Sequence, residues 1–155
     1  METGVCIRKA GEQDAHAVYR LICELENTNF EFELFKQFYT INVKDHKNIY
    51  LVASVNGQVC GFISCHSQLL LHHMDIVYEI QEMYVCEEQR GKGLGIGLMK
   101  HLEKELKLRQ CRHLEVSSNK LRDQAHEFYT SRGFNRTHYK FTRSFDFMHE
   151  YRNVL

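Results

Sequence analysis

Residues 77–106 read VYEIQEMYVCEEQRGKGLGIGLMKHLEKEL, and this segment contains two patterns joined by a glycine-rich stretch. Residues 77–86 have the apolar and aromatic side chains typical of a β-strand. Beyond the glycines, apolar residues recur at helical spacing, at Leu94, Leu98, Leu102 and Leu106. The segment therefore predicts a strand, a tight turn and an amphipathic helix in direct succession.

The glycine-rich turn is predicted to bind a phosphate group. At the start of a helix, free backbone N–H groups and the positive end of the helix dipole converge on one anion. Glycine lets the backbone approach that anion, and Arg90 and Lys92 add positive charge at the rim. The alternative is a glycine-rich helix start without a ligand, but each glycine inside a helix costs about 1 kcal/mol relative to alanine.

Two common nucleotide signatures do not match this turn. No glycine is followed by Lys-Ser or Lys-Thr, as a nucleotide P-loop requires. The glycines stand at every second position from 91 to 97, which differs from the Gly-x-Gly-x-x-Gly spacing of dinucleotide-binding proteins. The turn therefore predicts a phosphate ligand of another class.

Toward the N-terminus the sequence predicts one strand and two helices. Residues 5–8 alternate as in a short strand, and Asp14 can cap the first helix. A second amphipathic helix is predicted over residues 31–45. The apolar positions are Val18, Ile22 and Leu25 in the first helix and Leu34, Phe35, Phe38 and Ile41 in the second.

The middle of the chain predicts an antiparallel hairpin. Residues 49–55 and 58–67 are strand-like, and Asn56-Gly57 between them favours a two-residue turn because both positions tolerate positive φ. Residues 69–75 interrupt the pattern and are predicted to form a loop. The sheet should therefore be mostly antiparallel.

The last third of the chain predicts a strand, a helix and a final strand, over residues 112–118, 123–131 and 135–143. Gly133 suits the left-handed cap of the helix. Residues 145–155 have no pattern that assigns them a role. We expect one α/β domain over residues 1–155, with a mixed, mostly antiparallel sheet flanked by helices.

Composition excludes several classes of protein. The 20 Lys and Arg residues balance the 20 Asp and Glu residues, so no overall field favours nucleic acid or an acidic membrane. No apolar run approaches the roughly 20 residues that span a bilayer, and a cytoplasmic location is expected. The six cysteines lack a Cys-x-x-Cys pair and are predicted to be free thiols.

Arg90-Gly91-Lys92-Gly93-Leu94-Gly95 resembles the Arg/Gln-x-x-Gly-x-Gly/Ala acyl-CoA signature of the GNAT superfamily of N-acetyltransferases. Residues 7–10 with Asp14, and residues 125–129 leading to Gly133-Phe134, resemble the same family. The resemblance implies a GNAT fold whose sheet is splayed where acetyl-CoA binds. Glu87 stands where many members have a proline, but the cofactor contacts there are made by the backbone.

The family's cofactor contacts can be placed on this sequence residue by residue. The resemblance implies that the strand before the turn bonds the pantetheine arm through its backbone and that the turn amides hold the coenzyme A pyrophosphate. Asn119 is a further candidate for the pantetheine arm, with a turn-forming role as its alternative. The implied strand residues are Met83, Tyr84 and Val85, and the implied turn residues are Arg90, Gly91, Lys92, Gly93, Leu94, Gly95 and Ile96.

Acetyl transfer to an amine requires a base, because an alkylamine with a pKa of about 10 is mostly protonated at pH 7. Glu79 stands where GNAT enzymes often place a carboxylate base, and it is expected to act through a water. Glu82 is the competitor, but its odd offset from Glu79 sends it to the other face of a regular strand unless a bulge intervenes. Tyr129 matches the family tyrosine that protonates the departing thiolate; simple core packing is its alternative.

Further strings resemble the aminoalkylphosphonate N-acetyltransferases, namely Leu71-His72-His73, residues 79–82, residues 123–129 and residues 138–143. This resemblance implies a small primary amine that carries a phosphonate, and a divalent metal. On a final strand, His138 and Lys140 would share one face and, with His73, could bind the phosphonate. Candidate metal ligands are His72, His73, Glu79 and His138.

Other functions remain open at this point. One is acetylation of a different amine, such as a polyamine, an amino sugar or a protein N-terminus. Another is an acyl-CoA sensor without catalysis, against which the presence of both Glu79 and Tyr129 argues. A homodimer is one option for the oligomeric state.

Overall fold

The computed structural model describes residues 4–145. The chain divides into two compact units, Met1–Val116 and Ser117–Leu155. The expectation of one domain over residues 1–155 stays a prediction, and most of the tail at 145–155 lies outside the described residues. The elements are β1 (Val5–Lys9), η1 (Glu12–Asp14), α1 (Ala15–Glu26), α2 (Phe32–Lys44), β2 (Ile49–Val55), β3 (Gln58–Leu70), β4 (Asp75–Val85), η2 (Glu87–Gln89), α3 (Leu94–Leu108), β5 (His113–Val116) and α4 (Asp123–Ser131).

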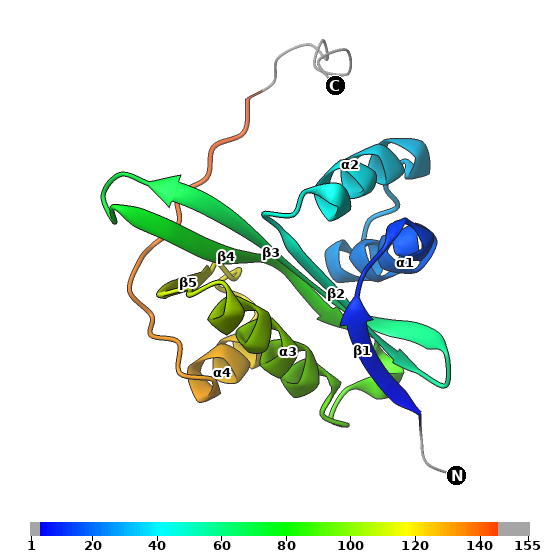
Figure 1. Cartoon of the computed structure of the whole chain (residues 1–155). Helices are drawn as coiled ribbons and strands as arrows, with labels where there is room; N and C mark the ends of the chain where they lie inside the picture. Colours follow the sequence, from blue (N-terminus) through cyan, green and yellow to red (C-terminus); the bar gives the residue numbers. More distant parts are fainter. Residues whose placement is uncertain (1–3, 146–155) are drawn as a thin grey trace. The chain divides into compact units, whose positions relative to one another are not determined.

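The first unit is built on one five-stranded sheet in the order β1-β2-β3-β4-β5 (Figure 1). Neighbouring strands from β1 to β4 are antiparallel, and β5 is parallel to β4. Asn56 and Gly57 both have positive φ, at 51° and 82°, in the turn between β2 and β3. The expected mixed, mostly antiparallel sheet is therefore confirmed.

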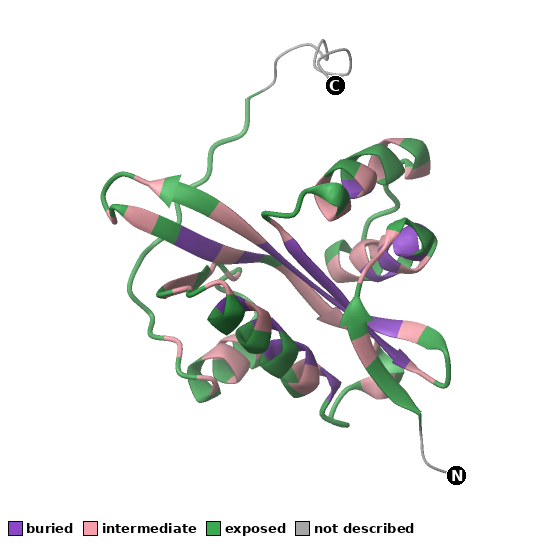
Figure 2. Cartoon of the chain, in the orientation of Figure 1, coloured by how far each residue is buried: buried purple, intermediate pink, exposed green. Residues whose placement is uncertain are grey.

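Helices cover both faces of this sheet. On one face, α1 and α2 pack a core that includes Val18, Tyr39 and Phe62. On the other face lies α3, and a Cβ added to Gly61 of β3 would stand 3.2 Å from Leu98. The strands between the two layers of helices are the most buried part of the unit (Figure 2).

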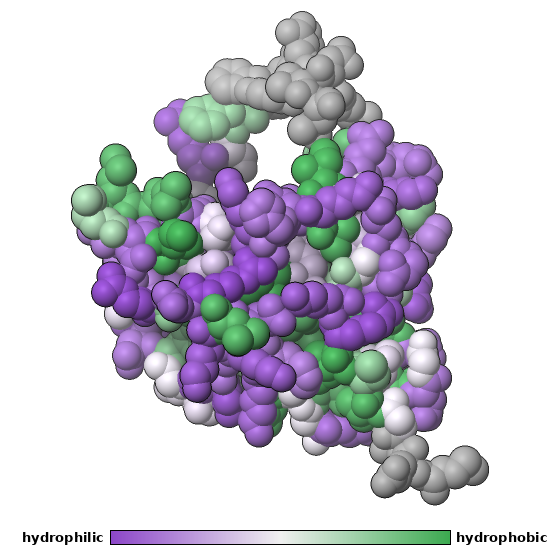
Figure 3. Space-filling model, in the orientation of Figure 1, coloured by the Kyte–Doolittle hydropathy of each residue, from purple (hydrophilic) through white to green (hydrophobic). Residues whose placement is uncertain are grey.

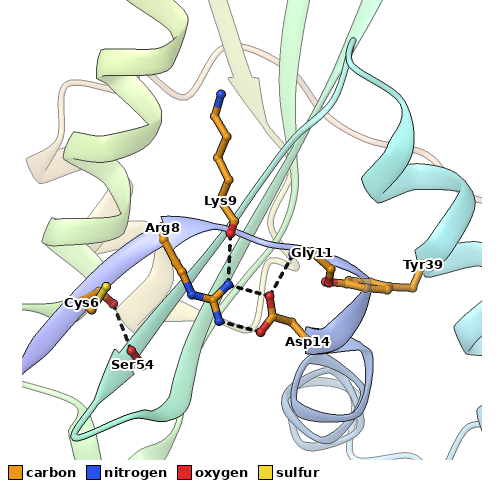
Figure 4. Close-up of polar contacts among 7 residues, drawn as sticks. All are labelled: Cys6, Arg8, Lys9, Gly11, Asp14, Tyr39 and Ser54. Carbon is orange, nitrogen blue, oxygen red and sulfur yellow. Dashed lines mark hydrogen bonds and ion pairs between the residues drawn. The ribbon is translucent and has the colours of Figure 1, made fainter.

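A partly buried ion pair joins the end of β1 to the start of α1 (Figure 4). Two guanidinium nitrogens of Arg8 donate to the Asp14 carboxylate at 2.7 and 2.8 Å, and the Gly11 amide donates to it at 2.9 Å. Burial raises the pKa of Asp14, but the hydrogen bonds from Arg8 and Gly11 outweigh this and hold it below its ordinary value. Tyr39 of α2 donates to the Gly11 carbonyl at 2.8 Å, which ties α2 to the same corner.

The loop predicted at residues 69–75 is wrong at both ends, because Leu69 pairs with Ile76 and Leu70 with Asp75. Only residues 71–74 form the turn. Apolar side chains gather at this hairpin tip (Figure 3), where Leu69, Leu71 and Met74 are 82%, 88% and 86% exposed. Backbone hydrogen bonds continue the β3–β4 pairing to this tip, although the side chains here are exposed and no longer alternate between a buried and an exposed face.

Two further predictions are wrong. Residues 135–143 form no strand and are exposed, because a regular alternation does not by itself supply the partner that a strand requires. In α2 the buried residue is Tyr39, whereas Phe38 and Ile41 are 45% and 54% exposed.

None of the helices in residues 4–145 has the length and apolar composition needed to cross a bilayer.

Candidate active site

A β-bulge in β4 brings two carboxylates to one face of the sheet. Glu82 pairs with Ser64 of β3 and Ile80 pairs with Cys65, which leaves Gln81 as an extra residue on β4. Glu79 pairs with His66, two residues from Ser64. Residues 64 and 66 share one strand face, so Glu79 and Glu82 lie on that face together. The bulge that the sequence analysis named as the exception is present, so Glu82 does not point away from Glu79 as it would on a regular strand.

Polar side chains of β2 and β3 surround these carboxylates. The fully buried Ser64 hydroxyl donates to Glu82 Oε2 and accepts from the Glu82 amide at 3.1 Å. The Tyr50 hydroxyl of β2 lies 2.8 Å from Nε2 of His66. We call the set Tyr50, Ser64, His66, Glu79 and Glu82 the β4 polar cluster.

Tyr50 stays a phenol across the physiological range. Burial raises its pKa, and the nearby charge of Glu82 raises it further. A protonated hydroxyl next to an imidazole nitrogen can donate a hydrogen bond to it. The sequence analysis missed Tyr50, Ser64 and His66, although polar residues at period two in an otherwise apolar strand could have marked the last two.

Beside this cluster, part of the β4 backbone edge is not paired with β5. β5 pairs with β4 only from Val77 to Ile80, so the two strands separate after that point. The Cys86 amide donates to the Cys60 carbonyl at 2.8 Å, so Cys86 is one of the residues whose backbone groups point toward β3. By alternation, the N–H and C=O groups of Met83 and Val85 point away from β3. Arg90 Nε indeed reaches the Val85 carbonyl at 3.0 Å from that side.

The glycine turn has the backbone conformation of an anion site. Gly91 and Gly93 have φ of 72° and 85°, which only glycine adopts without strain. α3 begins at Leu94, and the Gly97 amide is bonded to the Gly93 carbonyl at 2.9 Å. The amides of residues 94–96 precede that bond and have no helical acceptor. No side chain of the described residues caps this helix end.

The side chains of the turn are less free than the sequence suggested. The Arg90 guanidinium lies over the Tyr84 ring, 5.1 Å from its centre. Lys92 Nζ lies 3.3 Å from Gln89 Oε1. Arg90, Gly91, Lys92 and Gly93 are exposed, Leu94 is buried, and Gly95 and Ile96 are at the open helix end. The amides of residues 94–96, rather than these two side chains, are therefore the groups of the turn most open to a ligand.

Histidines collect where the β3–β4 turn meets β5. The rings of His72 and His73 lie 4.5 Å apart because residues 71–74 bend, with Met74 at a φ of 50°. His73 Nε2 is 3.7 Å from Glu115 Oε1, and Glu115 pairs in register with Glu79. Within residues 4–145, however, no three His, Cys, Asp or Glu side chains are arranged to hold a metal ion. Within the first unit, the proposed ligands His72, His73 and Glu79 are therefore not arranged as a metal site, and His138 lies in the second unit.

The second unit carries the other candidates. Tyr129 of α4 packs against the rings of Phe128 and Phe134, and burial raises its pKa, so its hydroxyl is protonated at neutral pH. Asn119 Oδ1 accepts from the Leu121 amide at 2.9 Å, the turn-forming geometry. His138 and Lys140 are exposed in a segment without strand structure, so the predicted basic strand face is absent there.

Known proteins similar to this chain share its fold. The family model described as Acetyltransferase (GNAT) family matches residues 13–134. The chain is 36% identical over 141 residues to the aminoalkylphosphonate N-acetyltransferase of Salmonella typhimurium, covering 90% of this chain and 92% of that protein.

Solved structures agree at lower identity. A transcriptional regulator from Bacillus halodurans has a TM-score of 0.82 at 21% identity, covering 91% of this chain and 99% of that one. The ribosomal-protein-alanine N-acetyltransferase of Brucella melitensis has a TM-score of 0.76 at 17% identity, covering 92% and 99%.

Proposed function

Because the chain belongs to the GNAT acetyltransferase family and is an acetyl-CoA-dependent N-acetyltransferase, we propose that its substrate is a small aminoalkylphosphonate. The identity of 36% with the Salmonella typhimurium enzyme, over nearly the whole of both chains, is the observation that carries this proposal. The amine-bearing substrate reacts directly with acetyl-CoA, without a covalent enzyme intermediate.

The cofactor is proposed to lie along β4 and end at α3. The pyrophosphate binds the open amides of residues 94–96 and the exposed turn before them, where the helix dipole adds to the attraction. The pantetheine arm bonds the outward backbone groups of Met83 and Val85, next to Tyr84. Asn119 is kept as a further contact of the arm, through its backbone or side chain.

The chemistry is proposed to need one proton acceptor and one donor. Glu79 takes a proton from the amine through a water, and the amine nitrogen then attacks the thioester carbon. Backbone amides of β4 stabilise the developing oxyanion. The carbon–sulfur bond breaks, and Tyr129 returns a proton to the thiolate, so the products are an amide and free CoA.

Glu79 is preferred over Glu82 because Glu82 is already engaged by Ser64, whereas Glu79 stands opposite His66. His73, whose Nε2 lies 3.7 Å from Glu115 Oε1, is the proposed contact of the phosphonate, joined by His138 and Lys140. No step of this proposal is assigned to a metal; His72, His73 and Glu79 stay the candidates of the first unit for holding one.

The test is to follow CoA thiol released from acetyl-CoA with 2-aminoethylphosphonate and with a propylamine control, each with and without a chelator. Release that depends on the phosphonate supports the substrate class. Turnover of a polyamine, an amino sugar or a peptide N-terminus instead would overturn it while leaving the family assignment intact. Tight CoA binding without thiol release on any amine would favour a sensor.

The same assay tests the base. Glu79→Gln should lower kcat by about a hundredfold, the usual size of a general-base contribution. Glu33→Gln, on the exposed first turn of α2, is the matched control and should leave kcat unchanged. A larger loss of kcat in Glu82→Gln than in Glu79→Gln would identify Glu82, and not Glu79, as the base.

A further inference from the structure

The β4 polar cluster contains a pair of side chains that the chemistry above does not use, Tyr50 and His66. Tyr50 is 8% exposed, and its hydroxyl lies 2.8 Å from Nε2 of His66. The two rings are stacked, with centroids 5.7 Å apart and planes 20° apart. A histidine held on one nitrogen by a buried phenol has a fixed ring orientation.

We propose that Tyr50 and His66 form a positioning pair for Glu79, in which Tyr50 donates to Nε2 of His66 and Nδ1 of His66 donates to the Glu79 carboxylate. This inference rests on the proposed function, because it takes Glu79 as the base. His66 and Glu79 are direct cross-strand partners, whose Cβ atoms lie about 5 Å apart in such ladders.

The direction of the hydrogen bond follows from the surroundings of Tyr50. Burial and the charge of Glu82 keep the hydroxyl protonated, so it has a proton to donate, and the pair takes it as the donor to Nε2. A neutral imidazole that accepts at Nε2 must carry its proton on Nδ1. The partner of a histidine thus selects its tautomer, and the other ring nitrogen becomes the donor.

The Tyr50 hydroxyl has a second polar neighbour, the Asn42 side chain of α2, whose hydrogen bond lowers the pKa of Tyr50. Such an effect is expected when the amide donates to the phenol oxygen, which leaves the phenol proton for His66. Tyr39 of α2 approaches Tyr50, with ring centroids 6.1 Å apart, and donates to the Gly11 carbonyl instead. Glu82 of β4 is engaged by Ser64 of β3. Glu79 is therefore the carboxylate that faces His66 across the ladder. Because of the bulge at Gln81, Glu82 is instead paired with Ser64.

The function of such a pair would be to hold the base in one orientation. A carboxylate that rotates freely spends little time in the geometry that reaches the water and the amine. A fixed N–H donor restricts that rotation. His66 is thus a positioning residue, and its loss should lower kcat while the KM for acetyl-CoA, which binds along β4 and α3, is unchanged.

The first test needs no turnover. Nitrogen-15 NMR of the imidazoles at pH 8 should show His66 as the Nδ1–H tautomer, and Tyr50→Phe should shift it toward the Nε2–H form. Glu79→Gln should move the Nδ1 resonance of His66, whereas Glu115→Gln, one strand farther away, should not. An Nε2–H tautomer in the unchanged protein, or no response to Glu79→Gln, overturns the pair.

The second test separates positioning from packing. Asparagine places an amide N–H near the position of Nδ1 and glutamine near Nε2, so His66→Asn should stay within about threefold of the original kcat while His66→Gln loses about tenfold. Tyr50→Phe should lose about tenfold, with Tyr19→Phe and His101→Asn as unaffected controls. Equal losses in both His66 variants overturn the proposal. Absence of turnover on every amine overturns the proposed function instead, and the NMR result still decides the pair.

Discussion

Asp14 shows how one residue can fix the geometry of an entire corner. It is 4% exposed and accepts hydrogen bonds from Arg8 and from the Gly11 amide. Removing its charge weakens the hydrogen bonds that it accepts from Arg8 and from the Gly11 amide. Asp14→Asn should therefore lower the free energy of unfolding by about 1 to 3 kcal/mol, measured by urea denaturation. Glu12→Gln, in the exposed pair with Lys44, should cost less than about 0.5 kcal/mol.

The same residue predicts an acid-sensitive stability. Because the pKa of Asp14 is lowered on folding, its contribution is fully present above the unfolded value of about 4 and is lost as the pH falls through the folded value. The stability difference between the original protein and Asp14→Asn should therefore shrink below pH 4. An unchanged difference down to pH 2 would contradict the assignment.

Tyr129 is the residue on which the proposed acid step depends. Its raised pKa keeps the proton on the phenol, so it can donate one to the thiolate. Tyr129→Phe should lower kcat by roughly tenfold to a hundredfold with little change in the KM for acetyl-CoA. The loss should be smaller with a thioester of a more acidic thiol, since such a thiolate leaves without help. Equal losses with both thioesters would indicate a packing role beside Phe128 and Phe134.

At the scale of elements, the start of α3 separates two kinds of glycine. Gly93 has a φ of 85° at the N-cap, whereas Gly97 lies inside the helix. Gly93→Ala should weaken acetyl-CoA binding at least tenfold, because a side chain there costs about 1 kcal/mol or more of backbone strain and displaces the amides. The measurement is calorimetric titration with acetyl-CoA.

Gly97→Ala is the internal control for that change. An added Cβ would meet only the terminal Cδ1 of Ile7, which can turn aside, and alanine favours a helix interior. Binding should therefore be nearly unchanged. If both variants lose affinity equally, the amides of residues 94–96 are not the anion site.

At the scale of the whole molecule, acetyl-CoA should stabilise the fold by joining β4 to α3. At a hundred times its Kd, a ligand adds about 2.7 kcal/mol, and for a chain of this size the Tm should rise by roughly 5 to 10 °C. Pantetheine lacks the pyrophosphate and should produce almost no rise at the same concentration in a thermal-shift assay. An equal rise with both ligands would locate the binding energy in the arm alone.

Some features could be read from the residues because they depend on neighbours in sequence. The Asn56-Gly57 turn, the helix at Leu94–Leu108 and the positive-φ glycines follow from local backbone preferences. These preferences act within a few residues, and the glycine turn was therefore identified correctly together with the strand before it.

Other features exist only in the folded sheet. The bulge at Gln81 appears only when β4 is aligned with β3, and it alone places Glu82 beside Glu79. Likewise, the contact between Tyr50 and His66 joins residues from different strands. The strand predicted at residues 135–143 failed for the same reason, because alternation is a property of the segment whereas a strand also needs a hydrogen-bonding partner. Sequence by itself determined the strand, the glycine turn and the helix that follows it, because these depend on local backbone preferences. Tertiary pairing decided which side chains meet at the proposed base, because those contacts join residues of different strands.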